Sequence, residues 1–163
     1  MKTDENLQQV IASVSSASVK FSAYAEIADK EGYRQVAKLF RAMAETQKVF
    51  AINAMRILGE LDNTENNLSA AIDVKTYEFT QLYPNFIEQA DQDGNPMAQT
   101  AYRAAMETTR SHVRILNTAL DNIGRNKEVD YWVCQMCGKI ESGEMPVGCK
   151  TCGAAREKFV RTV

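Results

Sequence analysis

Residues 134–153 read CQMCGKIESGEMPVGCKTCG and contain all four cysteines of the 163-residue chain. Cys134 and Cys137 form one CxxC pair, Cys149 and Cys152 form a second, and a glycine follows each pair. Two such turns, each presenting two sulfurs, predict one metal ion held by four thiolates in a tetrahedron. The alternatives are two disulfides, or free thiols with accidental spacing. The spacing does not choose between iron and zinc, because both accept four thiolates.

The segment that carries the cysteines predicts a small domain of its own. Residues 127–163 are too few to bury a sufficient apolar core, so binding of the ion is expected to supply folding free energy. Tyr131, Trp132 and Phe159 are expected to form an apolar cluster beside the metal. We therefore place one domain at residues 1–126 and a metal-binding domain at residues 127–163.

The chain before the cysteines predicts four long helices. Its four glycines stand at positions 32, 59, 94 and 124, and the stretches between them are rich in helix-forming residues. Asn95 followed by Pro96 marks the start of the last helix. Asp62 with Glu65 is a candidate capping box for the third helix, and Pro84 predicts a kink or bulge inside that helix.

Apolar residues recur along each predicted helix at spacings of three and four, which is typical of a four-helix bundle. Polar residues interrupt three of these stripes near their middles: Gln47, Lys75 with Glu78, and Thr109 with His112. They predict a polar layer across the bundle centre. The alternative is that long side chains such as Lys75 lie at the edge of the stripe and reach water.

An internal repeat supports two related helical hairpins. Residues 29–50 read DKEGYRQVAKLFRAMAETQKVF, and residues 91–112 read DQDGNPMAQTAYRAAMETTRSH. The segments align without gaps at an offset of 62 residues, and Gln47 and Phe50 fall on Thr109 and His112. A pseudo-twofold relation between the hairpins, with the polar layer on its axis, is the expected arrangement.

Composition narrows the classes of partner and compartment. The formal net charge of −2 gives no electrostatic reason to expect nucleic acid or an acidic membrane as a partner. No apolar run is long enough to span a bilayer, and the first residues do not form a secretory signal. Because the metal accounts for every cysteine, we expect a reducing, cytoplasmic location.

The combination of helical bundle and four-cysteine tail resembles the rubrerythrin family over nearly the whole chain. Five segments carry the likeness: EGYRQVAKLF (31–40), NLSAAI (67–72), YEFTQLYPNF (77–86), LDNI (120–123) and YWVCQMCG (131–138). The spacer between the cysteine pairs is about one residue shorter than the family's, and CKTCG lacks a proline that often follows its first cysteine. Neither difference removes a ligand. The resemblance implies a ferritin-like four-helix bundle followed by a rubredoxin-like domain.

The family's bundle holds a di-iron site, built from carboxylates and two Glu-x-x-His units. The positions that correspond in this chain are Val14 for the first-helix glutamate, Gln47 and Phe50 for the first Glu-x-x-His unit, Lys75 and Glu78 for two glutamates, and Thr109 and His112 for the second unit. Glu78 and His112 alone keep the ligand type. One carboxylate beside a lysine cannot neutralise two ferrous ions in a poorly solvating core. We therefore predict that the di-iron centre and its peroxidase activity are lost.

In place of the irons we expect the Lys75 ammonium, paired with Glu78 one turn away and hydrogen-bonded to Gln47, Thr109 and His112. The alternative is simple loss of metal, with Val14 and Phe50 filling the space by packing.

The resemblance implies a function for the tail. It predicts one iron on Cys134, Cys137, Cys149 and Cys152 and one-electron transfer with a redox partner protein that the sequence does not identify. The alternative is a non-catalytic structural or assembly protein with zinc in the tail, and oxidoreductase activity rests on resemblance alone. The family also implies a homodimer, with helices exchanged between subunits as one possibility.

Overall fold

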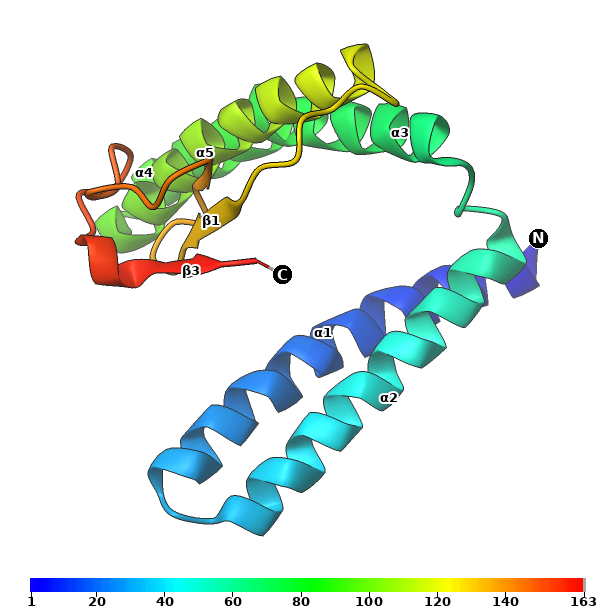
Figure 1. Cartoon of the computed structure of the whole chain (residues 1–163). Coiled ribbons are helices and arrows are strands. Elements are labelled where there is room, and N and C mark those ends of the chain that lie inside the picture. The colour runs from blue at the N-terminus through cyan, green and yellow to red at the C-terminus, as the bar shows by residue number, and fades with distance from the viewer. Residues whose placement is uncertain (163) are drawn as a thin grey trace. The chain divides into compact units, whose positions relative to one another are not determined.

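The computed structural model describes residues 1–162, in which helices are followed by a small antiparallel sheet (Figure 1). The chain divides into two compact units, Met1–Asp62 and Asn63–Val163. This architecture confirms the predicted mainly helical fold. The predicted domain boundary after residue 126 lies inside the second unit and stays a prediction. Among the described residues, no helix is both long and apolar enough to cross a membrane.

The first unit is an antiparallel hairpin of α1 (Lys2–Lys30) and α2 (Arg34–Leu58). Its buried seam consists of small side chains: Ser18, Ala25, Ala28, Ala37, Ala44, Ala51 and Ala54. The Ser18 hydroxyl crosses the seam and donates a 3.0 Å hydrogen bond to the carbonyl of Ala44. The distance between packed helices follows the size of the contacting side chains, so this seam favours a close pair.

The larger apolar residues of α2 lie beside that seam. The inward stripe that the periodicity predicts for this helix is Val36, Phe40, Met43, Gln47, Phe50, Ala54 and Ile57. Ala54 is buried as predicted, but Ala37, Ala44 and Ala51 are buried in place of the stripe residues that precede them by one position. Phe50 and Ile57, which belong to the stripe, remain 50% and 72% exposed. The unit therefore presents an apolar face that its own two helices do not cover.

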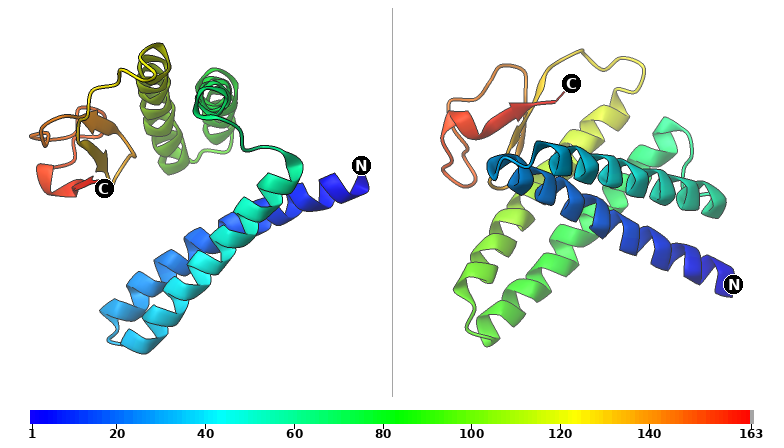
Figure 2. Two further views of the ribbon diagram at one scale, coloured as in Figure 1. Left: turned by 45° about the vertical axis from the view of Figure 1, so that its right-hand side comes forward. Right: turned by 90° about the horizontal axis from the view of Figure 1, so that it is seen from below.

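The second unit contains another hairpin, in which α3 (Thr64–Tyr77), η1 (Glu78–Leu82) and α4 (Tyr83–Gln92) pack along α5 (Pro96–Asp121) (Figure 2). Asn95 caps α5 as predicted, because its side chain accepts a 3.0 Å hydrogen bond from the Ala98 N–H. The cap predicted for α3 is wrong by one residue. Asn63, not Asp62, is the N-cap and accepts from the Asn66 N–H at 2.9 Å.

The predicted irregularity near Pro84 is confirmed. The segment η1 is a π-helical turn that ends two residues before Pro84, and the proline stands in the first turn of α4. Proline lacks the N–H for a helical hydrogen bond, and its ring clashes with the preceding turn. A wider turn at this point lets the helix continue.

The turn between α1 and α2 and the turn between α4 and α5 contain the same backbone hydrogen bonds. The internal repeat is therefore confirmed for these turns. Tyr33 N–H donates to the Ala28 carbonyl at 2.8 Å, and Asn95 N–H donates to the Ala90 carbonyl at 2.9 Å, 62 residues later. Gly32 and Gly94 hold the matching left-handed positions, with φ of 86° and 64°. The relation of the two hairpins about a common axis stays a prediction.

The cysteine-bearing segment forms a three-stranded antiparallel sheet in the order β2-β1-β3, from β1 (Tyr131–Cys134), β2 (Ile140–Ser142) and β3 (Phe159–Arg161), with a short 3-10 turn, η2 (Arg156–Lys158), before β3. Its buried core is Cys134, Cys149 and Phe159, against which Trp132 and Met145 pack. Tyr131, predicted in this cluster, is instead 39% exposed. Successive residues of a strand face opposite sides, so Tyr131 points away when Trp132 points inward.

Candidate metal centre

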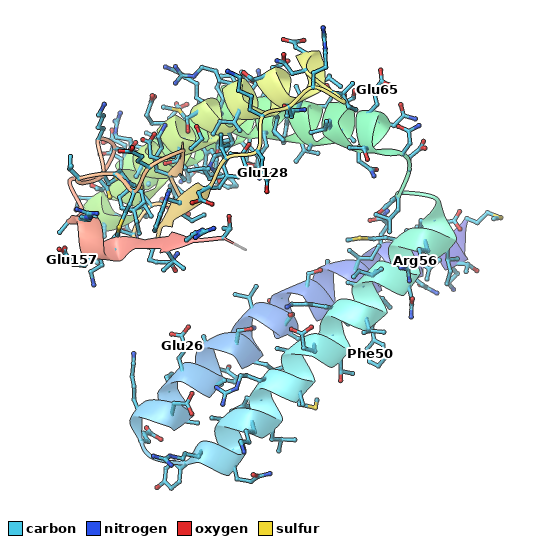
Figure 3. All side chains as sticks on the ribbon, in the orientation of Figure 1. Glu26, Phe50, Arg56, Glu65, Glu128 and Glu157 are labelled. Atoms are coloured by element: carbon cyan, nitrogen blue, oxygen red, sulfur yellow. The ribbon has the colours of Figure 1, made fainter. Side chains whose placement is uncertain are left out.

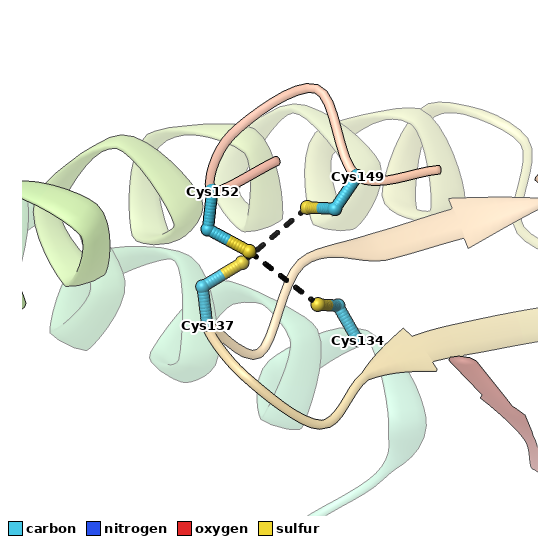
Figure 4. A group of neighbouring side chains, drawn as sticks. All are labelled: Cys134, Cys137, Cys149 and Cys152. Carbon is cyan, nitrogen blue, oxygen red and sulfur yellow. Dashed lines mark hydrogen bonds between the residues drawn. The ribbon is translucent and has the colours of Figure 1, made fainter. Parts of the chain in front are cut away.

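The four cysteine sulfurs converge between two turns, residues 134–138 and 149–153, which we call the first and second cysteine knuckles (Figure 4). All four lie within 4.8 Å of one another. Cys134 Sγ is 3.8 Å from Cys152 Sγ, and Cys137 Sγ is 3.5 Å from Cys149 Sγ. A tetrahedral ion with metal–sulfur bonds of about 2.3 Å places its sulfurs about 3.8 Å apart. The donor set therefore fits a four-thiolate metal ion, and the close approach involves no disulfide.

Two matched backbone turns hold the sulfurs. In the first, Gly138 N–H donates to the Cys134 carbonyl at 2.8 Å, and Cys134 N–H donates to the Lys139 carbonyl at 2.9 Å. The second repeats both bonds fifteen residues later, from Gly153 to Cys149 and from Cys149 to Ala154. Gly138 and Gly153 have φ of 74° and 73°, a region that a side chain strongly disfavours. The glycine that follows each CxxC is thus explained by backbone conformation.

Burial and backbone N–H groups have opposite effects on the pKa of the cysteines. Burial raises the pKa of Cys137 to about 12, although the N–H of Lys139 donates to this sulfur and acts in the opposite direction. At Cys152 burial also raises the pKa, against a matching N–H from Ala154. At Cys149 burial again raises the pKa, but the N–H groups of Cys152 and Thr151, together with the side chains of Cys137 and Cys152, outweigh it and bring the value to about 7.

Exposure differs among the four cysteines. Cys134 is fully buried and Cys149 nearly so, whereas Cys137 is partly buried and Cys152 is exposed. Trp132 closes the inner side, and its indole N–H donates to the Gly143 carbonyl at 2.9 Å. The cage therefore has a protected side toward the sheet and an accessible side toward Cys152.

The seven positions that correspond to a di-iron site are divided between the two units. Val14, Gln47 and Phe50 belong to α1 and α2, where Phe50 is half exposed (Figure 3). Lys75, Glu78, Thr109 and His112 belong to the second unit. There the Lys75 ammonium lies 2.9 Å and 3.0 Å from the two oxygens of Glu78. The predicted ion pair between these two residues is confirmed.

The other members of the predicted polar layer have distinct surroundings. Thr109 is buried on α5 at 5% exposure. His112 is half-buried, and burial is the main cause that lowers its pKa from 6.5. The charge of Lys75 lowers this pKa further, while Glu78 raises it, so both groups lie within electrostatic range of the imidazole. Hydrogen bonds from Gln47, Thr109 and His112 to Lys75 stay a prediction.

One contact of His112 was not predicted from the sequence. Its Nε2 lies 3.1 Å from the carbonyl oxygen of Gly138, in the first cysteine knuckle. A Cβ added at Gly138 would meet Thr108 of α5 at 3.9 Å, so the knuckle and the helix are in close proximity there. Residue types carry no signal for a bond to a backbone carbonyl 26 residues away. The presence of one histidine in the chain was the only available indication.

Fold and site together define a helical protein whose helices are followed by a four-cysteine cluster that could hold a metal ion. The sequence model of the rubrerythrin family matches residues 5–120. Rubrerythrin-1 of Clostridium acetobutylicum is 32% identical over 93% of this chain and 89% of its own length. Nigerythrin of Nitratidesulfovibrio vulgaris is 26% identical over 96% of this chain and 85% of its own length.

Solved structures give the same result. Nigerythrin in a partially reduced state matches 98% of this chain and 86% of its own, with a TM-score of 0.61 and 26% sequence identity. Nigerythrin in a fully reduced, all-ferrous state matches with a TM-score of 0.60. The chain belongs to the rubrerythrin family, as its sequence resemblance implied, and its fold class is the ferritin-like helical fold with a rubredoxin-like tail.

Proposed function

We propose that this protein is a one-electron carrier that holds a single iron on Cys134, Cys137, Cys149 and Cys152 and has no di-iron centre. The observation that carries the proposal is the contrast between two sites. At one, four sulfurs have tetrahedral spacing and matched N–H donors. At the other, the one surviving carboxylate of the second unit's di-iron positions is bound through both oxygens to an ammonium.

The ion pair argues against metal at the helical site on physical grounds. Glu78 is 18% exposed, so its charge is poorly solvated and needs a partner. Lys75 supplies that partner and would repel a divalent cation at the same place. Two ferrous ions would bring four positive charges to a site whose second-unit residues offer one carboxylate and one imidazole. We therefore expect no peroxide reduction at these helices.

The cysteine cage is suited to electron exchange. An iron bound there supplies a ferric/ferrous couple, and backbone N–H groups toward the sulfurs tune its potential. The matched turns keep the four sulfurs in place in both states, because their glycines already have the required conformation. Rigid ligands of this kind limit rearrangement when the charge changes.

The accessible side of the cage offers a surface for a redox partner protein. A groove of about 730 Å³ adjoins Cys137 and Cys152 and is otherwise lined mainly by apolar residues such as Met97, Ala101 and Met136. Met97 and Met136 are 83% and 65% exposed. Exposed methionines at a shallow apolar groove are typical of adaptable protein contacts. We place the exchange of electrons with the partner at this face.

The metal content of protein purified from its native host tests the proposal. We expect about one iron per chain, with the visible absorption of a ferric thiolate that bleaches on reduction. The variant Cys152→Ser should lose both the colour and the metal. About one zinc per chain in a colourless protein would instead support a structural role. About three irons per chain would show that the di-iron centre is retained.

We further propose a homodimer, in which the uncovered face of the first hairpin meets a second copy and helices can be exchanged. Phe50 and Ile57 on that face are too exposed for a stable isolated hairpin. Light scattering should give twice the chain mass, and Ile57→Glu should shift the population toward monomer.

Because thiolate ligation requires reduced cysteines, we place the protein in the cytoplasm. Fractionation of native cells, with the protein recovered from another compartment, would contradict that placement.

A further inference from the structure

The contact between His112 and the first cysteine knuckle has a defined polarity. A carbonyl oxygen only accepts hydrogen bonds, so the Nε2 atom 3.1 Å from the Gly138 oxygen must carry the proton. Burial is the largest effect and lowers the pKa of the ring, and the charges of Lys75 and Lys139 add to it. The hydrogen bond to Gly138 and the charge of Glu78 raise this pKa, but the net shift is downward from 6.5. The imidazole is therefore neutral near pH 7, with Nε2–H donated to the knuckle.

The peptide that accepts this bond also serves the metal cage. Its carbonyl belongs to Gly138, and its N–H belongs to Lys139 and donates to the sulfur of Cys137. One planar peptide thus joins the imidazole to a ligand sulfur, since both groups share a delocalised amide. A hydrogen bond to the carbonyl polarises the amide and strengthens the bond that its N–H donates.

We propose that His112 is a positioning residue for the four-cysteine centre, which polarises the Gly138–Lys139 peptide and so strengthens the N–H bond to Cys137. The ferrous cage carries one more negative charge than the ferric cage, and stronger N–H donors favour the more negative state. His112 therefore raises the reduction potential of the centre. The inference rests on the proposed function only in requiring that the cage accepts iron.

Lys75 supports the role of His112, because its charge lowers the pKa of the imidazole. In a helical di-iron site a histidine ring would face metal, whereas here the same ring lies within electrostatic range of the Lys75–Glu78 pair. That pair is close to neutral as a unit, and its ammonium disfavours protonation of the imidazole. Burial is the main cause that lowers the pKa of the ring, and the ammonium adds to it, so the ring stays in the neutral form whose single N–H is donated to the Gly138 carbonyl.

Two variants of His112 separate the hydrogen bond from packing. His112→Phe keeps an aromatic ring and removes the donor. His112→Gln keeps an N–H donor at the end of a side chain of comparable reach. Thr118→Ala, on an exposed position of the same helix, serves as the matched control. Each protein is loaded with iron and titrated with dye mediators, so that one electron enters the cage and no bond forms or breaks.

At a fixed potential, we expect the ferrous-to-ferric ratio of His112→Phe to fall about threefold, equivalent to roughly 30 mV at 59 mV per tenfold change for one electron. His112→Gln should recover most of that loss, and Thr118→Ala should match the wild type. Equal ratios in wild type and His112→Phe would overturn the proposal. So would a His112→Gln variant that behaves like His112→Phe, because that result would assign the effect to ring packing.

The hydrogen bond itself is tested without iron. His112 is the only histidine of the chain, so labelling histidine with ¹⁵N gives a single set of ring signals in the diamagnetic zinc-loaded protein. We expect the pattern of a neutral ring protonated at Nε2, with slow exchange of that proton. A ring protonated at Nδ1 would overturn the proposal. Native protein that carries zinc would contradict the proposed electron transfer. The redox titration of iron-loaded protein and the ¹⁵N spectra of zinc-loaded protein would still test the role of His112.

Discussion

At the scale of single residues, the Lys75–Glu78 pair is the observation on which the proposed loss of the di-iron centre rests. Both oxygens of Glu78 contact the same ammonium, and the carboxylate is mostly buried while the lysine side chain is 38% exposed. A buried carboxylate without a partner is costly, and an ammonium satisfies it without any further acid residues. In the proposed function, the Lys75 ammonium supplies the positive charge that a metal cation would otherwise bring to Glu78.

This pairing predicts a measurable coupling energy. In a double-mutant cycle of Lys75→Met and Glu78→Gln, we expect a coupling of about 1 kcal/mol in the free energy of unfolding, discounted for the exposure of Lys75. Urea unfolding of the four metal-loaded proteins measures it. Glu45 and Lys48 form an exposed pair with the same spacing on α2, and their cycle should give a few tenths of a kcal/mol or less. Equal couplings in the two cycles would refute the special role of the Lys75–Glu78 pair.

His112 predicts a dependence of stability on pH. Its pKa in the folded protein lies below 6.5, mainly through burial, so on acidification the unfolded chain takes up the proton first. The stability that wild type owes to neutral His112 is therefore complete above the unfolded pKa and is lost as the pH falls below it. The difference in unfolding free energy between wild type and His112→Phe should shrink between about pH 7.5 and pH 5.5.

The measurement compares urea unfolding of the two zinc-loaded proteins at each pH. Loss of metal in acid affects both proteins and cancels in the difference, and Thr118→Ala should follow the wild type. A difference that is constant over the range would mean that His112 has an ordinary pKa.

At the scale of elements, the repeated turns show that two different sequences specify one connection. DKEGY and DQDGN both end a helix with glycine in the left-handed region, and each closes with the same pair of backbone hydrogen bonds. Glycine adopts this conformation at no steric cost, and the pattern of bonds is that of a Schellman cap. The side chains of the five-residue turns vary because the backbone carries the connection.

Because the two turns have the same backbone conformation, replacing the glycine of either turn should lower the free energy of unfolding by the same amount. Nothing lies within 4 Å of a Cβ added at Gly32 or Gly94, so substitution by alanine strains only the backbone. We expect Gly32→Ala and Gly94→Ala each to lower the free energy of unfolding by about 1 kcal/mol. Thermal or urea unfolding measures both. If one substitution costs several times more than the other, the turns are not equivalent and the repeat does not extend to their energetics.

At the scale of the whole molecule, we expect the cysteine-bearing segment to depend on a bound ion for its fold more than the helices do. Its sheet has three short strands, and two of the three residues of its buried cluster are ligand cysteines. Without the ion these thiols lose the bonds that hold the knuckles together, and the apolar cluster is too small to fold alone. The helices bury their seams without help from the ion.

Metal removal therefore has a predicted signature. A chelator should shift the emission of Trp132, the only tryptophan of the chain, to longer wavelength as it becomes exposed. Far-ultraviolet circular dichroism should retain most of its helical signal. Cys137→Ser should give the same result with no chelator present. An unchanged tryptophan emission would mean that the domain folds without metal.

Sequence alone was sufficient wherever local pattern controls structure. The spacing of Cys134, Cys137, Cys149 and Cys152 predicted that the four sulfurs converge, because a tetrahedral site requires two short turns with two sulfurs each. Glycine positions and apolar periodicity predicted where the helices run. The alignment of the chain with itself at an offset of 62 residues predicted that the two turns are alike. The i,i+3 spacing of Lys75 and Glu78 placed both on one helix face, so their pairing was predictable.

Only the tertiary structure decided contacts that depend on how elements pack. Ala28 and Ala54 of the predicted stripes are buried in the seam of the first hairpin. The rest of that seam lies one position beside the stripes, on Ser18, Ala25, Ala37, Ala44 and Ala51, because small side chains let the two helices approach. Asn63 rather than Asp62 caps α3. Both residue types can cap a helix, so the residue at which the backbone enters the helix decides which of them does so. The bond from His112 to the Gly138 carbonyl joins a side chain to a backbone atom, and backbone atoms are the same in every sequence. No residue pattern encodes such a contact, and it follows only from the packing of α5 against the cysteine knuckle.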